Sequence, residues 1–170
     1  EISLGLVGSE MCIRDSNYTT VIDYAAANNK ELENFYPAFK AVKDYVVQAP
    51  EKTTGWYLPS IGQWYDFTAN LGGLPSWDDA INEGNDLTPN LYRWSNQTEL
   101  VSKINAYFEP LGTGNYDAIP NGSYQKFFSS STYSDSGIWT WFVGKQANVV
   151  QCWHNVRYNS DSAVRPILAF

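Results

Sequence analysis

The last third of the chain constrains the fold most strongly. Residues 124–170 contain short runs rich in Val, Trp, Phe and Tyr, and Gly, Asn, Ser and Asp separate one run from the next. Runs of this length and composition are typical of β-strands, and short breaks between them favour antiparallel hairpins. We therefore predict a β-meander made from "KFFSSSTYS", "GIWTWFVG", "NVVQCWHNVRY" and "SAVRPILAF".

Two segments upstream of these strands have apolar residues at helical spacing. Residues 31–48 are expected to form one helix, with Pro37 in its first turn, where the missing N–H does no harm. Residues 98–111 are expected to form another, capped by Thr98.

A third helix is predicted between these two. It follows a short aromatic strand at 55–59, and Ser60 and Gln63 have the spacing of a capping box at its start. Gly72 is expected to end it, and residues 72–96 to form a long polar loop with at most one helical turn, near 78–81. The chain therefore predicts an α+β fold, with helices packed on a small twisted antiparallel sheet and long irregular loops.

The first sixteen residues, "EISLGLVGSEMCIRDS", differ in character from the rest. They resemble the translated sequencing-adaptor sequence that contaminates metagenomic gene models. We therefore expect residues 1–16 to be non-native, residues 17–170 to form a single domain, and the true N-terminus to be missing. For the same reason we do not expect a disulfide between Cys12 and Cys152.

The net charge of −7 bears on the class of partner. Binding to nucleic acid through phosphate needs clustered Lys and Arg, and no such cluster occurs. No apolar run is long enough to span a membrane. We expect no nucleic-acid partner and no membrane insertion by this fragment, whereas the aromatic share of 16% favours a surface that recognises a ligand.

Three motifs carry a resemblance to a known family: "GWYLPSIGQW" at 55–64, "FFSSSTYS" at 127–134 and "AVRPILAF" at 163–170. Together they resemble a family of bacterial surface domains with the C-type-lectin-like fold, which is related to formylglycine-generating (sulfatase-modifying) enzymes. The resemblance spans roughly residues 31–170. The family often has Trp where this chain has Phe128, and Glu after the Ser-Ser-Thr segment, which this chain lacks.

The resemblance implies a location and a source. Such domains are common in lipoproteins and adhesin-like proteins of gut bacteria. It implies an extracellular or cell-surface domain, anchored through a lipoprotein or displayed on a phage.

A narrower branch of the fold comprises the variable proteins of diversity-generating retroelements. In that branch, selected codons in the C-terminal segment are diversified, and they encode exposed positions on the lectin face. Residues 127–170 resemble such a segment, with a constant frame that includes Ser129, Ser130 and Arg165. The ligand-binding candidates within it are Tyr133, Asp135, Trp139, Trp141, Gln146, Gln151, Trp153, His154, Arg157 and Tyr158.

The stretch "VVQCWHNVRY" raises the question of catalysis or metal binding. One Cys and one His are too few ligands for a structural zinc, and the pair is too far apart along a strand for an ordinary nucleophile–base hydrogen bond. Calcium binding by loop Asp and Asn side chains remains an alternative. So does hydrolysis of a sugar by a pair of carboxylates from the loops. Those carboxylates are Asp78, Asp79, Glu83, Asp86 and Asp117.

These observations predict a non-enzymatic domain without a cofactor, which binds a protein or glycan through its aromatic-rich C-terminal face. One alternative is a structural adhesin or pilus-tip module in which this face is unimportant. Another is an enzyme related to the sulfatase-modifying factors, although Cys152 lacks the paired cysteine of that chemistry once Cys12 is set aside.

Overall fold

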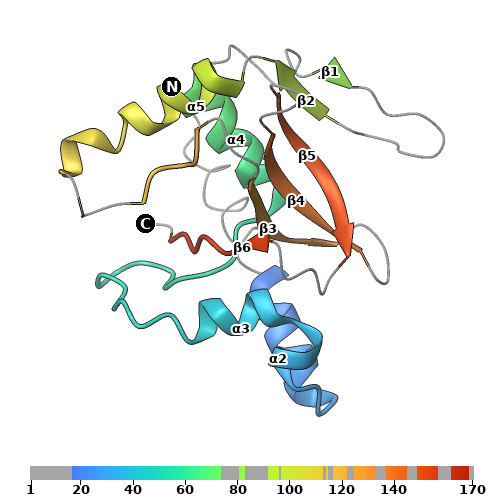
Figure 1. Ribbon diagram of the computed structural model, residues 1–170. Helices are drawn as coiled ribbons and strands as arrows, with labels where there is room; N and C mark the ends of the chain where they lie inside the picture. The colour runs from blue at the N-terminus through green and yellow to red at the C-terminus, as the bar shows by residue number, and fades with distance from the viewer. Residues whose placement is uncertain are drawn as a thin grey trace, which may run out of the picture.

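The computed structural model shows an α+β fold in which helices lie against a single β-sheet (Figure 1). The residues that it describes are 17–73, 81–82, 92–95, 97–112, 114, 117–121, 125–132, 137–144, 149–156 and 162–168. The adaptor-like segment 1–16 therefore lies outside the described residues, and all statements below concern the described part.

The described strands form one six-stranded sheet. Neighbouring strands are antiparallel except β3 and β6, which run parallel, so the prediction of a purely antiparallel sheet is wrong at this edge. In their order across the sheet the strands are β1 (Ile81–Asn82), β2 (Tyr92–Ser95), β5 (Val149–Val156), β4 (Gly137–Gly144), β3 (Gln125–Thr132) and β6 (Ser162–Ala163).

Two of these strands lie in the segment 72–96, which was predicted to be an irregular loop. Ile81 belongs to β1, and β2 pairs with β5 through contacts that include Trp94 opposite Val150. The Gly-, Pro- and Asn-rich composition of the segment hides these short strands, because β2 is defined by a partner strand more than fifty residues away and β1 is defined by β2. The predicted helical turn lies mostly outside the described residues.

Helix α4 (Ile61–Gly72) begins as predicted. The Ser60 hydroxyl accepts a hydrogen bond from the Gln63 amide at 3.2 Å, and the Gln63 side-chain oxygen accepts one from the Ser60 amide at 2.9 Å. This reciprocal pair satisfies two donors that the helix cannot satisfy itself. The helix ends one residue later than predicted, because Gly73 adopts the left-handed cap with a φ of 71°.

The other predicted helices are shorter than expected. The segment 31–48 divides into α2 (Leu32–Phe35) and α3 (Pro37–Lys43), since Tyr36 precedes a proline and is held out of the helical region. The segment 98–111 becomes α5 (Gln97–Ala106), and Thr98 lies inside it. A short 3-10 turn (Glu109–Leu111) follows.

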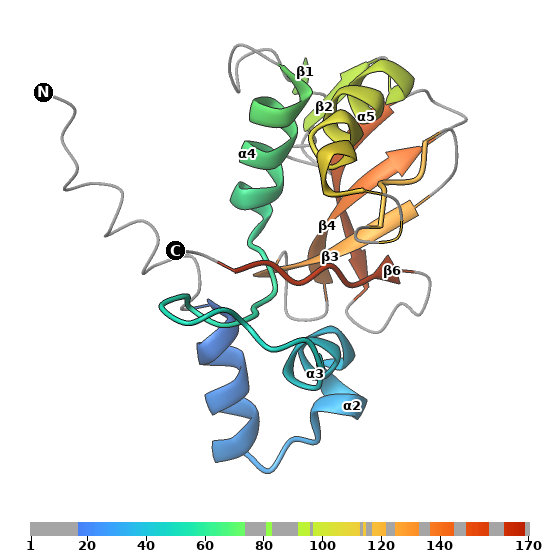
Figure 2. The same cartoon turned by 90° about the vertical axis from the view of Figure 1, so that its left-hand side faces the viewer.

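The main core lies between the sheet and helices α4 and α5 (Figure 2). Trp141 of β4 is fully buried at its centre and stacks on Trp64 of α4, with ring centroids 4.9 Å apart. Phe127 from β3 contacts both indoles at 5.5 Å. Ile104 of α5 is a buried member of the same cluster.

A second core joins the N-terminal helices to the sheet. Phe39 and Val42 of α3 pack with Leu58, Phe128 and Ile138, and side chains of the helical segment 17–27 cover them. Both views show these helices lying below the sheet, apart from α4 and α5 (Figures 1 and 2).

The three sequence motifs meet in space. Tyr57 forms an antiparallel bridge with Ile167, the Ser130 amide donates to the Pro59 carbonyl at 2.8 Å, and Phe127 pairs with Ala163. A further hydrogen bond joins the serine run 129–131 to the start of α4: the Ser131 hydroxyl accepts it from the Ile61 amide at 3.0 Å. Segments distant in sequence therefore form one scaffold, which is the role predicted for these motifs.

Candidate functional site

The predicted binding residues fall largely outside the part of the chain that the structure describes. Tyr133, Asp135, Gln146, Arg157 and Tyr158 lie outside the described residues. Gln151, Trp153 and His154 lie on β5, but only their backbone is described. Side chains are described for two of the ten, Trp139 and Trp141.

Trp141 is not a surface residue, so its assignment to a binding face is wrong. Its side chain is 0% exposed, and the rings of Trp64, Phe67 and Phe127 surround it. A side chain enclosed in this way cannot reach a ligand unless the core opens. The large ring fills the centre of the core instead.

Trp139 lies two residues earlier on β4 and is partly exposed. It packs against the edge of the main core, and its carbonyl accepts a hydrogen bond from the Ser129 hydroxyl at 2.7 Å. The β4–β5 register places Trp139 opposite His154, while Thr140 is opposite Trp153. Consecutive positions of a strand belong to opposite faces, so the Trp153 and His154 positions do not share one face.

Cys152 is a free thiol that is buried opposite Trp141. Burial raises the pKa of the Cys152 thiol, and a hydrogen bond with Tyr65 opposes this shift only partly. Because the thiolate is the reactive form, a buried thiol with a raised pKa is a poor nucleophile. Cys152 therefore behaves as a core residue.

Metal binding finds no support among the described side chains. They contain no group of three or more His, Cys, Asp or Glu residues able to hold a metal ion. Asp117 is exposed, and the other loop carboxylates considered above lie outside the described residues. The calcium and carboxylate-pair alternatives therefore stay untested.

The structure reveals a cleft that the sequence reasoning missed, which we call the Arg165 cleft. It has a volume of about 620 Å³, within the range of small-ligand sites. The C-terminal segment 163–166 lines it. This segment runs between the chain that follows α3 and the chain that follows α5 (Figures 1 and 2). Its walls include Tyr45, Trp56, Phe108, Leu111, Asp117 and Pro120.

Arg165 was predicted to be a buried scaffold residue that bonds to a carbonyl or a carboxylate. It is half-buried and donates a hydrogen bond to the backbone carbonyl of Asp117, which confirms the carbonyl partner. Its guanidinium lies 5.5 Å from the centroid of the Phe108 ring, a cation–π geometry. Burial lowers the pKa of Arg165, and the negative charges of Asp117 and Tyr45 act in the opposite direction.

One signal in the sequence could have pointed to this cleft. Tyr45, Val46 and Val47 are consecutive apolar residues just after α3, and three in a row cannot all face a core. The structure leaves Tyr45 42%, Val46 92% and Val47 50% exposed. Leu111 on the opposite side of the cleft is 55% exposed.

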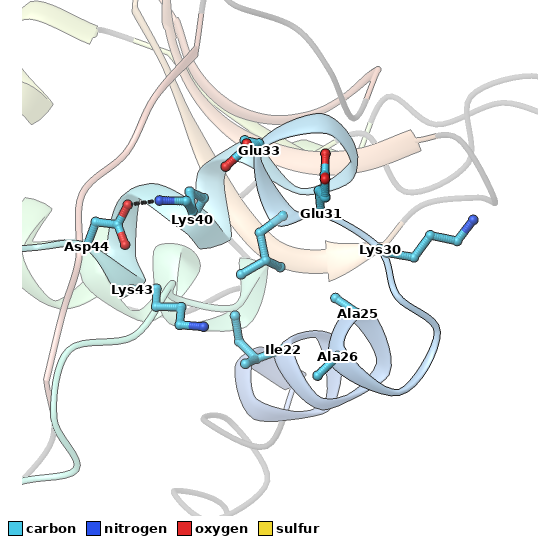
Figure 3. Close-up of a pocket in the computed structure, with 10 residues that line it drawn as sticks. Ile22, Ala25, Ala26, Lys30, Glu31, Glu33, Lys40, Lys43 and Asp44 are labelled. Atoms are coloured by element: carbon cyan, nitrogen blue, oxygen red, sulfur yellow. Dashed lines mark hydrogen bonds and ion pairs between the residues drawn. The ribbon is translucent and has the colours of Figure 1, made fainter.

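A smaller cavity of about 370 Å³ lies between the helical segment 17–27 and helices α2 and α3 (Figure 3). Ile22, Ala25 and Leu32 give it an apolar lining. Two of its cations have a neighbour: Lys40 pairs with Asp44, and Lys30 lies 4.5 Å from the Phe35 ring centroid.

No helix in the described ranges is long and apolar enough to cross a membrane. Comparison with protein-family models, with curated proteins and with solved structures found no match for this chain.

Proposed function

We propose that this chain is a C-type-lectin-like domain that binds a protein or glycan without catalysing a reaction, outside the cell or on its surface. The observation that carries the proposal is the meeting of the three motifs on which the resemblance rests. Tyr57 pairs with Ile167, and Ser130 bonds to Pro59, so the residues that define the resemblance also contact one another. If the three motifs matched the family only by chance, they would have no reason to contact one another in the fold.

The state of Cys152 favours binding over catalysis. The sulfatase-modifying alternative needs a reactive cysteine, and this thiol is buried with a raised pKa. If thiol-blocking reagents abolished an enzymatic activity of the native chain, that alternative would replace the proposal.

The proposed binding face comprises the β4–β5 hairpin and the segments that follow each strand. Trp141 no longer belongs to it, and Trp153 and Arg157 are its main candidates. A large aromatic ring and a guanidinium are the side chains that most often dominate the binding energy of a protein surface.

The test is a binding screen on the purified chain, using a printed glycan array and a phage-displayed peptide library. We expect a ligand that is lost when Trp153→Ala and Arg157→Ala are combined. The control is Tyr24→Ala, because Tyr24 is an aromatic side chain that is 51% exposed and belongs to the helical segment 17–27 rather than to the proposed face. Binding that survives the double substitution would favour the structural adhesin or pilus-tip alternative.

Diversification of residues 127–170 is a separate part of the proposal. Sequencing this locus across its source population should show substitutions at the binding candidates, a constant frame and an adenine-rich near-copy nearby. We expect Trp141 to stay constant with the frame, since it fills the core. A uniform segment without a near-copy would refute the retroelement hypothesis and leave a fixed binder.

A further inference from the structure

The Arg165 cleft is preformed, because hydrogen bonds within the chain hold both of its walls. On one side the Trp56 indole donates to the Val47 carbonyl at 2.7 Å, which fixes the exposed segment after α3. On the other side the Asn105 side chain makes two hydrogen bonds of 2.8 Å to the backbone of Ile119. A site that is already in place loses little conformational entropy when a ligand binds.

Arg165 carries a positive charge in the cleft, and the negative charge of Asp117 acts on it. Within the described part of the chain it forms no ion pair with a carboxylate, and its hydrogen bond is to the Asp117 backbone carbonyl. Phe108 supports one face of the guanidinium, and a guanidinium has five N–H donors. A half-buried arginine with spare donors is suited to a carboxylate, which it can bind with two parallel hydrogen bonds.

The walls of the cleft suit an apolar side chain better than a sugar ring. A sugar ring stacks on an open aromatic face. The Phe108 ring already contacts Phe67 and Arg165, and one ring of the edge-to-face pair Tyr45–Trp56, whose centroids are 5.2 Å apart, has a face covered by the other. Leu111, which lines the cleft, is 55% exposed and adds an aliphatic surface.

We propose that the Arg165 cleft binds the C-terminal end of a partner peptide. The terminal carboxylate is held by Arg165, and the last side chain, which is apolar, packs between the Tyr45–Trp56 pair and Leu111. Capture of a free terminus is a recurring mode of peptide recognition. Trp139 and Trp141, the two of the ten candidates whose side chains are described, do not line this cleft, and the inference is argued from residues other than the proposed binding face.

The test uses labelled octapeptides of Gly and Ser that end in Val, Leu, Ile, Met or Phe. Each peptide is made with a free carboxylate and with a C-terminal amide, and fluorescence polarisation measures its binding to the full chain. We expect at least one free acid to bind about tenfold or more tightly than its amide, because a charge-assisted hydrogen bond is lost. The Arg165→Ala variant should bind acid and amide equally weakly.

A second pair of variants covers the case in which Arg165→Ala does not fold. Leu111→Asp places a negative charge in the wall of the cleft and should abolish binding. Tyr107→Asp is the matched control, because Tyr107 is 60% exposed, lies four residues earlier and does not line the cleft. Circular dichroism checks that both variants are folded.

Three results would overturn the inference. In the first, amides bind as tightly as free acids, so the carboxylate is not recognised. In the second, no peptide of the set binds. In the third, an oligosaccharide of glucuronic acid binds in an Arg165-dependent manner while the peptides do not, which would make the ligand an acidic sugar.

Discussion

Trp141 combines a large contact area with one unsatisfied polar group. Its indole N–H has no hydrogen-bond partner in the described part of the chain, although the side chain is fully buried. We expect Trp141→Ala to lower the free energy of unfolding by about 3–5 kcal/mol, because it leaves a cavity in the main core. Trp141→Phe should cost clearly less, since it keeps a ring against Trp64 and removes the unpaired donor. Urea denaturation measures both; a loss below about 1 kcal/mol for Trp141→Ala would contradict the central position of this residue.

Cys152 is expected to make the free energy of unfolding fall as the pH rises. Burial raises the pKa of its thiol above the usual value of 9.0, so the folded state keeps the proton when the unfolded state has lost it. The resulting stabilisation is complete below pH 9 and is lost as the pH rises above it. We expect the free energy of unfolding to fall more steeply above pH 9 in the native chain than in Cys152→Ala, by at most about 1.4 kcal/mol per pH unit. Equal slopes in denaturant titrations from pH 8 to 10 would show that the thiol ionises freely in the folded state.

Helix α4 offers a matched pair of glycines. A Cβ atom on Gly72 would lie 2.2 Å from the Leu100 Cδ1 atom, which is itself in the packed core, whereas the nearest atom to a Cβ on Gly62 is the Ser60 Oγ at 3.7 Å. We expect Gly72→Ala to destabilise the protein by about 1–3 kcal/mol through overpacking. Gly62→Ala should stabilise it by about 0.5–1 kcal/mol, because alanine restricts the unfolded chain. Thermal unfolding compares the two, and the same sign of change in both would contradict the close approach of α4 and α5.

Elements were predictable where their cause is local. The capping box at Ser60 depends on residues three apart, so its chemistry can be read from the sequence. The break at Tyr36 could also have been predicted, since the residue before a proline avoids the helical region. Strands β1, β2 and β6 could not, because two to four residues show no pattern of their own. Strands β2 and β6 depend on partners that are distant in sequence, and β1 depends on β2.

The candidate sites also divide into features with a local cause and features that depend on contacts between distant segments. The alternating spacing of "WTW" indicates that Trp139 and Trp141 share a face of β4, but only the packing of α4 shows that this face is buried. The Arg165 cleft is assembled from segments near residues 45, 110, 120 and 165, so no single stretch of sequence contains it.

At the scale of the whole molecule, the described residues of both cores lie between 18 and 164. Residues 1–16 lie outside the described residues, and their sequence predicts that they are non-native. We therefore expect deletion of residues 1–16 to change the midpoint of thermal unfolding by no more than about 1–2 °C, the size of a surface effect. A drop of 5 °C or more would show that the segment belongs to the folded domain.

The bridge between Tyr57 and Ile167 joins residues 110 positions apart. During translation, Tyr57 leaves the ribosome long before its partner has been synthesised, and the long closing contact makes folding slow. A nascent chain interrupted before residue 167 would lack the partner of the buried Tyr57, which exchanges two backbone hydrogen bonds with Ile167. The bridge thus couples completion of the fold to synthesis of the chain as far as residue 167.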